Sequence, residues 1–147
     1  MKTHAPRVFV VDDDASFVRS ALRLLASWGI ATEGFTSAAE FLARGLPEDR
    51  ACALVDLRMP SVNGYDLLEA LERAGRSLPL IFMSGHTDAA LGAEAIRRGA
   101  VDFLTKPVDE RLLLAAIERA LDADAREGLE PLLPRAEQPP AGTASVA

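Results

Sequence analysis

Cysteine and long apolar runs are scarce in this sequence. Cys52 is the single cysteine among 147 residues, so an intramolecular disulfide is excluded, and its place in the apolar run 51–55 indicates a small buried hydrophobe. The longest uninterrupted apolar run, residues 112–117, is far too short to span a bilayer, and the first seven residues carry no apolar stretch of the signal-peptide kind. We therefore expect a cytoplasmic protein without membrane association.

Basic residues are fewer than acidic residues in this sequence. The chain has 16 Lys and Arg residues against 22 Asp and Glu residues, which gives a formal net charge of -6. Such a field repels phosphate backbones and anionic lipid surfaces, so direct nucleic-acid binding by this chain is disfavoured. With 147 residues, of which 49% are hydrophobic, the chain can bury one real core, but a second folded domain would not fit comfortably.

Five short apolar or β-branched runs alternate with five amphipathic helical stretches. This pattern is typical of βα units that feed a parallel sheet with helices on both faces, so we predict an α/β fold with a doubly wound five-stranded parallel sheet. The predicted strands are residues 7–11, 30–35, 51–55, 80–83 and 101–104, and the predicted helices begin near Ala15, Ser37, Gly64, Asp88 and Asp109.

The composition changes at Asp122. From there the sequence is rich in Ala, Glu and Pro, and the helical periodicity of apolar residues stops. We therefore predict a folded domain over residues 1–121 and a disordered tail or linker over residues 122–147.

Polar residues follow the predicted strands at their carboxyl ends, where ligand sites of open parallel sheets lie. Taken singly, each has an ordinary structural interpretation: Asp14 is an N-cap, Asp56 caps a loop, Ser84 is a solvated hydroxyl and Lys106 is a surface charge. The combination indicates more. Three carboxylates at one sheet edge, Asp12, Asp13 and Asp56, would repel one another unless a cation neutralised them.

A hard divalent cation suits this set of oxygen ligands. Mg²⁺ is usually held by one or two carboxylates together with water and phosphate oxygens, and the His and Cys ligands that favour zinc are absent here. A carboxylate beside Mg²⁺ and a lysine is a nucleophile for phosphoryl groups. In this hypothesis Asp56 attacks phosphorus, while the metal, Lys106 and the Ser84 hydroxyl each take one phosphoryl oxygen.

Over residues 7–121 the sequence resembles the receiver domain of two-component response regulators. The family pattern is a strand ending in paired acids, an acceptor strand followed by Met-Pro, and then a Gly, a hydroxyl and a Lys-Pro pair. Segments 82–86 and 99–104 are most similar to receivers that control nitrogen-fixation or transport genes. The family features appear in order as Asp12-Asp13, Asp56 with Met59-Pro60, Gly64, Ser84 and Lys106-Pro107.

The resemblance implies the flavodoxin-like receiver fold with strand order 2-1-3-4-5. It assigns Mg²⁺ or Mn²⁺ to Asp12, Asp13, Asp56 and the backbone carbonyl of Arg58. It makes Asp56 the phosphoacceptor, Lys106 the phosphate-binding cation and Ser84 the switch hydroxyl. It also makes Phe103 the aromatic residue that changes rotamer, although the residue taken alone would be interpreted as part of the strand core. It also implies a cis Lys106–Pro107 bond. Two further side chains, Arg58 and His86, are placed to govern how water reaches the phosphoryl group, and their interpretation as exposed loop side chains stays open.

The resemblance also implies partners. A sensor histidine kinase or phosphotransfer protein would supply the phosphoryl group, and an output domain or partner protein would bind the surface of the fourth helix, fifth strand and fifth helix. A phosphorylation-dependent homodimer through this surface is a further option in the family. Many relatives continue into a DNA-binding or ATPase domain, so the chain is either a stand-alone receiver or the front of a longer protein.

Such a domain is a switch that catalyses only its own phosphorylation and dephosphorylation. Two other functions stay open at this point. A haloacid-dehalogenase-like phosphatase also uses Asp, Mg²⁺ and Lys, but it needs a DxD pair on the first strand and a cap insertion that is absent here. A constitutive docking module would lack an acid, the hydroxyl or the lysine, and none is missing.

Overall fold

The computed structural model describes residues 6–47, 50–59, 63–85 and 89–128 of the chain. Five strands form one parallel sheet in the order β2-β1-β3-β4-β5, which confirms the predicted fold class and strand order. The strands are β1 (Arg7–Val11), β2 (Ala31–Phe35), β3 (Ala51–Asp56), β4 (Leu80–Ser84) and β5 (Asp102–Thr105). The helices are α1 (Ala15–Ser27), α2 (Ala38–Arg44), α3 (Gly64–Arg73), α4 (Ala89–Arg97) and α5 (Glu110–Gly128).

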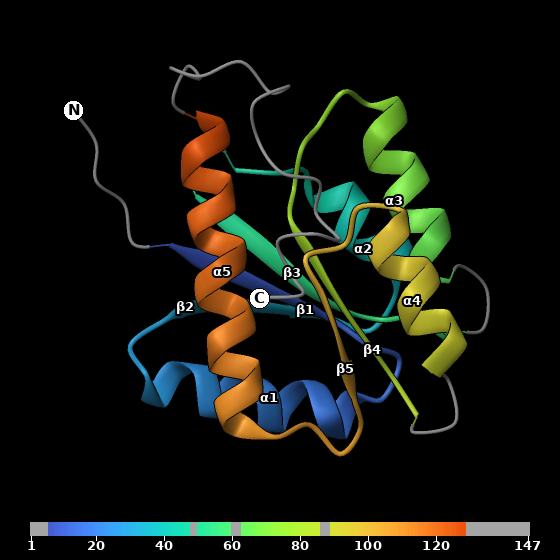
Figure 1. Cartoon of the computed structure of the whole chain (residues 1–147). Coiled ribbons are helices and arrows are strands. Elements are labelled where there is room, and N and C mark those ends of the chain that lie inside the picture. The colour runs from blue at the N-terminus through green and yellow to red at the C-terminus, as the bar shows by residue number, and fades with distance from the viewer. Residues whose placement is uncertain (1–5, 48–49, 60–62, 86–88, 129–147) are drawn as a thin grey trace.

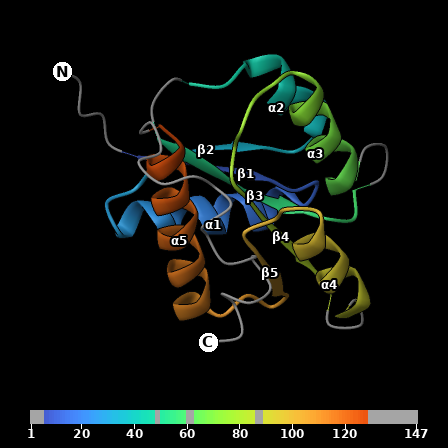
Figure 2. The same cartoon turned by 45° about the horizontal axis from the view of Figure 1, so that its top comes forward.

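Helices cover both faces of the sheet (Figures 1 and 2). On one face, α1 and α5 pack on Val8, Val10 and neighbouring strand residues, and Cys52 lies buried in this layer as predicted. On the other face, α2, α3 and α4 contribute to a second core layer with Phe9 and Phe82. All six residues of β3 are buried because the strand lies in the middle of the sheet with helices on both sides.

Side-chain caps begin several of the helices that follow the carboxyl ends of strands. Asp14 is the N-cap of α1, as predicted, and its carboxylate accepts hydrogen bonds from the amides of residues 16 and 17 at 3.0 and 3.2 Å. Asn63 and Asp66 form a capping box at the start of α3. Asp109 accepts from the Arg111 amide at 2.8 Å before α5. These caps fix the loops at the sheet edge where the polar residues gather.

Three strands, β3, β4 and β5, end one residue later than predicted, and β2 and β5 also begin one residue later. Two of the later ends involve candidate site residues. β3 extends to Asp56, which is in register with Met83, and β4 extends to Ser84, which is in register with Thr105. Regular pairing with the neighbouring strand therefore holds the backbone of both residues up to the last position of the sheet.

The last helix is longer than predicted. The periodicity was expected to stop at Asp122, but α5 continues to Gly128. The physical reason is that Ala, Arg and Glu within residues 123–127 favour a helix without an apolar stripe, and the first proline of the segment comes only at Pro131. The helix end is corrected accordingly. The predicted disorder of residues 129–147 lies outside the described residues, and the division into domain and tail stays a prediction.

Within the described part of the chain, no helix has the length and apolar character needed to cross a membrane.

Candidate functional site

Buried polar side chains gather at the carboxyl edge of the sheet. Among the described residues, the buried polar or charged side chains are Asp12 after β1, Asp56 at the end of β3 and Ser84 at the end of β4. Their exposed fractions are 0%, 7% and 2%. Because burying a carboxylate is costly, two buried carboxylates at one edge indicate a functional site and not ordinary packing.

Asp13 joins the two buried carboxylates in one cluster. Each of Asp12, Asp13 and Asp56 offers a carboxylate oxygen, and these atoms lie within 4.8 Å of one another. Asp13 is exposed, so the cluster opens to solvent on its side. The structure therefore brings together the three carboxylates that the sequence predicted, in an arrangement of oxygen donors that suits a hard divalent cation with bound water.

Backbone amides orient the two buried carboxylates in the same way. Oδ1 of Asp12 accepts a hydrogen bond from the Asp14 amide at 2.9 Å, and Oδ1 of Asp56 accepts from the Arg58 amide at 3.2 Å. In both cases the donor lies two residues farther along the chain. The Oδ2 atoms of both side chains face Lys106 instead.

Lys106 is the positive charge of the site. Its Nζ lies 2.7 Å from Oδ2 of Asp12 and 3.7 Å from Oδ2 of Asp56. Its amide donates to the Ser84 carbonyl at 2.7 Å, which fixes the backbone beside the end of β4. Burial alone would lower the pKa of Lys106, but the hydrogen bond to Asp12 and the surrounding carboxylate charges raise it overall. Lys106 is therefore a fixed cation at every pH near neutrality.

The Asp56 carboxylate is harder to ionise than an ordinary aspartate. Burial, followed by the charge of Asp12, raises the pKa of Asp56 from 3.8 to about 6, although Lys106 and the Arg58 amide act in the opposite direction. A divalent cation bound in the cluster would add positive charge and favour the ionised form. Asp56 is thus a carboxylate whose nucleophilic form depends on the cations around it.

This pKa predicts how stability depends on pH. Between about pH 4 and pH 6 the folded protein binds more protons at Asp56 than the unfolded chain, so the free energy of unfolding decreases as the pH rises through this interval. Without divalent metal, we expect a decrease of up to about 3 kcal/mol. Urea denaturation in a chelating buffer measures it. The matched variant Asp56→Asn should show a shallower dependence, and an equal slope in both proteins would contradict the assignment.

Of the remaining predictions for the site, one is confirmed and others stay predictions. The Lys106–Pro107 bond is cis, as predicted. Phe103 lies on β5 in register with Phe82, is partly buried, and packs in the cluster beneath α4. The Arg58 amide binds Asp56, while the role of the Arg58 carbonyl as a metal ligand stays a prediction. His86 lies outside the described residues, so its role stays a prediction too.

Sequence reasoning missed one neighbour of the site. The ring of Phe17, in the first turn of α1, lies under Lys106, with Nζ 4.6 Å from the ring centre. Such a cation–π contact favours one position of the ammonium group. The signal was present in the sequence, because Phe17 lies one turn after Asp13 and the start of α1 was predicted correctly, but the pairing of a helix residue with Lys106 depends on tertiary structure.

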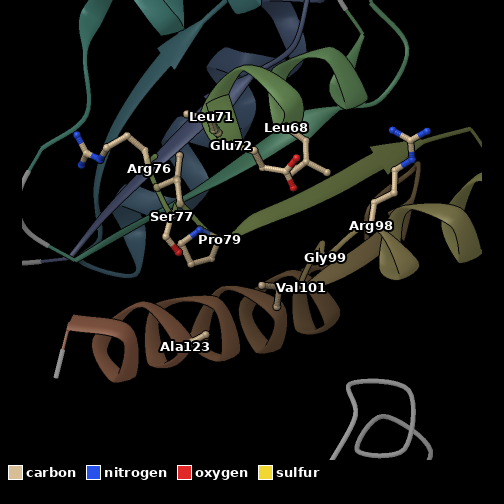
Figure 3. A pocket seen from close by; sticks show the side chains of 11 residues that line it. Leu68, Leu71, Glu72, Arg76, Ser77, Pro79, Arg98, Gly99, Val101 and Ala123 are labelled. Atoms are coloured by element: carbon tan, nitrogen blue, oxygen red, sulfur yellow. The ribbon is translucent and has the colours of Figure 1, made fainter. Parts of the chain in front are cut away.

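A separate hollow lies at the opposite edge of the sheet, near the amino ends of β4 and β5 (Figure 3). Its volume is about 480 Å³, and its lining includes Leu68, Leu78 and Val101. The guanidinium groups of Arg76 and Arg98 extend away from each other on its two sides (Figure 3). Ligand sites have a few convergent polar groups, so the carboxylate cluster, and not this hollow, is the candidate site.

Comparisons of the sequence with protein families and with individual proteins all point to the same family. Residues 8–118 match the response regulator receiver domain. The chain is 43% identical over 121 residues to the transcriptional regulatory protein FixJ of Azorhizobium caulinodans, and 39% identical over 119 residues to the nodulation protein W of Bradyrhizobium diazoefficiens. The expected likeness to receivers of nitrogen-fixation regulators is confirmed. These alignments cover 82% and 81% of this chain but 57% and 52% of the two relatives, so the chain spans about half their length.

Solved structures agree with the sequence relatives. The response regulator StyR superposes with a TM-score of 0.79 and 38% identity, covering 85% of this chain and 63% of that one. The crystal structure of FixJ-N superposes with a TM-score of 0.74 and 36% identity, covering 83% of this chain and 96% of that one. The folded part of the present chain thus corresponds to nearly the whole of FixJ-N.

Proposed function

This chain belongs to the response regulator receiver family, and from that premise we propose that the carboxylate of Asp56 accepts a phosphoryl group and thereby switches the chain between two states. The observation that carries the proposal is the position of Asp56, buried at the end of β3 beside two other carboxylates and 3.7 Å from the Lys106 ammonium. Receivers are phosphoacceptor switches and not enzymes acting on an external substrate, so the phosphatase hypothesis is set aside.

The donor set of the cluster fits Mg²⁺ or Mn²⁺. Asp12, Asp13 and Asp56 would hold the ion, with the Arg58 carbonyl as a further ligand, and the exposed side at Asp13 leaves room for water. When bound, the ion supplies positive charge to the phosphoryl oxygens. Because Lys106 already pairs with Asp12, a bound ion would compete with the lysine for that carboxylate and would weaken the Lys106–Asp12 ion pair.

The transfer step follows from the residues around Asp56. A carboxylate oxygen of Asp56 forms a bond to phosphorus while the bond from phosphorus to the donor breaks, and the donor group leaves with that electron pair. The Lys106 ammonium would bind one phosphoryl oxygen, and the Ser84 hydroxyl would bind another. The amide of Arg58 keeps the carboxylate oriented throughout, since it holds Oδ1 from the backbone.

The partners follow from the same proposal. The donor would be a phosphohistidine of a sensor kinase or phosphotransfer protein in the cytoplasm. The output would be a domain or partner protein that contacts the surface of α4, β5 and α5, or a second copy of the chain on that surface. The alignment with FixJ, whose name describes transcriptional regulation, covers only 57% of that protein, so the nature of the output belongs to the proposal.

The test is the intact mass of the protein after incubation with Mg²⁺ and a small acyl-phosphate donor. We expect one added phosphoryl group in the wild type and none in Asp56→Asn. Asp14→Asn is the matched control, because it changes a neighbouring carboxylate that caps α1 and should keep the adduct. An adduct of equal yield in Asp56→Asn would contradict the proposal, and no adduct in any protein with Mg²⁺ bound would favour a constitutive docking module.

A further inference from the structure

The ring of Phe103 lies directly against the backbone of α4. A Cβ atom built on the buried Gly92 would lie 2.6 Å from Cδ2 of Phe103 and 3.0 Å from both Cγ and Cε2. Real Cβ atoms do not approach a ring carbon as closely as 2.6 Å, so the observed ring position requires a residue without a side chain at 92.

The backbone gives no other reason for this glycine. Gly92 lies within the helix α4, and it is not among the glycines with positive φ, which are residues 29, 45, 75 and 99. Alanine is more stable than glycine in the interior of a helix, so the local structure favours Ala at this position. The close contact with Phe103 is therefore the feature that Gly92 serves.

A second observation concerns α4, the other partner of this contact, which is held against α3. The Tyr65 hydroxyl of α3 donates a hydrogen bond to the Leu91 carbonyl at 2.9 Å, one residue before Gly92. The Arg98 guanidinium lies 4.4 Å from the centre of the Tyr65 ring and binds Glu94 at 3.0 Å. These contacts tie α4 to α3 before and after residue 92, so we expect the ring to move more readily than the helix when the space at residue 92 is filled.

We propose that Gly92 is the positioning residue that holds the Phe103 ring beside α4, and that this ring position is the one that belongs to the unphosphorylated state. The inference rests on the proposed function, in which Phe103 changes position between the two states. A methyl group at residue 92 removes the space for the ring beside α4 and increases the population of the other position. A ligand that binds only the second state then binds more tightly, because less free energy is spent on the change of state.

The ring position is measured by NMR without any ligand, in protein with labelled phenylalanine. In the wild type we expect nuclear Overhauser contacts between the Phe103 ring and the α-protons of Gly92. In Gly92→Ala we expect the ring contacts to residue 92 to be lost and contacts towards Ser84 to appear. Ring contacts with the new methyl group, at unchanged intensity to the rest of α4, would overturn the inference without touching the proposed function.

The population shift is measured as affinity for beryllofluoride, a mimic of the phosphoryl group, in the presence of Mg²⁺. We expect Gly92→Ala to bind about three to ten times more tightly than the wild type. In the Phe103→Ala background the same substitution should have no effect, because the ring is gone. Equal affinity of wild type and Gly92→Ala would overturn the inference, whereas failure of the wild type to bind the mimic would overturn the proposed function and the inference together.

The helix propensity of alanine needs its own control. The double variant Gly92→Ala/Ala93→Gly keeps the composition of α4 and moves the methyl group from an exposed position to the buried one. It should bind beryllofluoride as tightly as Gly92→Ala, and Ala93→Gly alone should bind like the wild type. If Ala93→Gly alone weakened binding and the double variant returned to the wild-type value, helix stability would explain the effect and the role of Gly92 would be refuted.

Discussion

Asp13→Ala is expected to weaken Mg²⁺ binding by about 100-fold or more while leaving the fold intact. Removal of groups that only support a metal ligand already costs 10- to 100-fold in affinity, and Asp13 is proposed as a ligand itself. Its side chain is exposed, and it lies close to the carboxylates of Asp12 and Asp56. Without metal, its removal relieves repulsion, so the free energy of unfolding should stay equal or rise by up to about 0.5 kcal/mol.

The neighbouring residue Asp14 provides the matched control. It is exposed as well, but its carboxylate caps α1 through two backbone amides. Asp14→Ala should therefore lower the free energy of unfolding by about 1 kcal/mol and keep the Mg²⁺ affinity. Calorimetric titration with Mg²⁺ and urea denaturation in chelating buffer separate the two effects. Unchanged Mg²⁺ affinity in Asp13→Ala, or its loss in Asp14→Ala alone, would refute the ligand assignment.

Lys106→Met should lower the free energy of unfolding and raise the affinity for Mg²⁺. Methionine keeps the apolar stem beside Phe17 but removes the ammonium group, and the fully buried carboxylate of Asp12 loses its partner at 2.7 Å. Breaking a buried pair is expensive, and with 27% of the Lys106 side chain exposed we expect a loss of about 3 kcal/mol in chelating buffer. Mg²⁺ should bind more tightly than in the wild type, because the competing cation is gone.

Two comparisons make the Lys106 prediction specific. Arg7→Met removes a half-exposed ion pair with Glu33 at 3.5 Å, so it should cost less than about 1 kcal/mol and leave Mg²⁺ affinity unchanged. The decrease of stability with pH should shift to higher pH in Lys106→Met, because Lys106 lowers the pKa of Asp56. A variant with wild-type stability in chelating buffer and weaker Mg²⁺ binding would contradict the competition between Lys106 and the ion.

The sequence was sufficient to predict the fold class and to group the charged side chains of the site. The strands have clear apolar patterns, and parallel strands place their carboxyl ends at one edge, so the sequence alone groups Asp12, Asp13, Asp56 and Lys106. Helix starts were predictable because Asp14 and Ser37 are side-chain caps that act within a few residues. These predictions depend only on patterns within a few neighbouring residues.

Contacts between distant elements were not predictable from the sequence. Three such contacts are the Phe17 ring with Lys106, the hydrogen bond from Tyr65 to Leu91 and the packing of Phe103 on Gly92. Each joins a helix to another element or to a loop. None of them follows a periodic pattern. The end of α5 was missed for another reason, because residues 123–127 favour a helix by composition while lacking an apolar stripe.

The claim that Asp56 is the phosphoacceptor is tested most directly by locating the phosphoryl group. After treatment with Mg²⁺ and an acyl-phosphate donor, borohydride reduces an aspartyl phosphate to homoserine, and peptide mass spectrometry then locates the change. The account predicts homoserine at position 56 alone, formed only when Mg²⁺ is present. Homoserine at position 12 or 13, or a stable phosphate ester on Ser84, would contradict it.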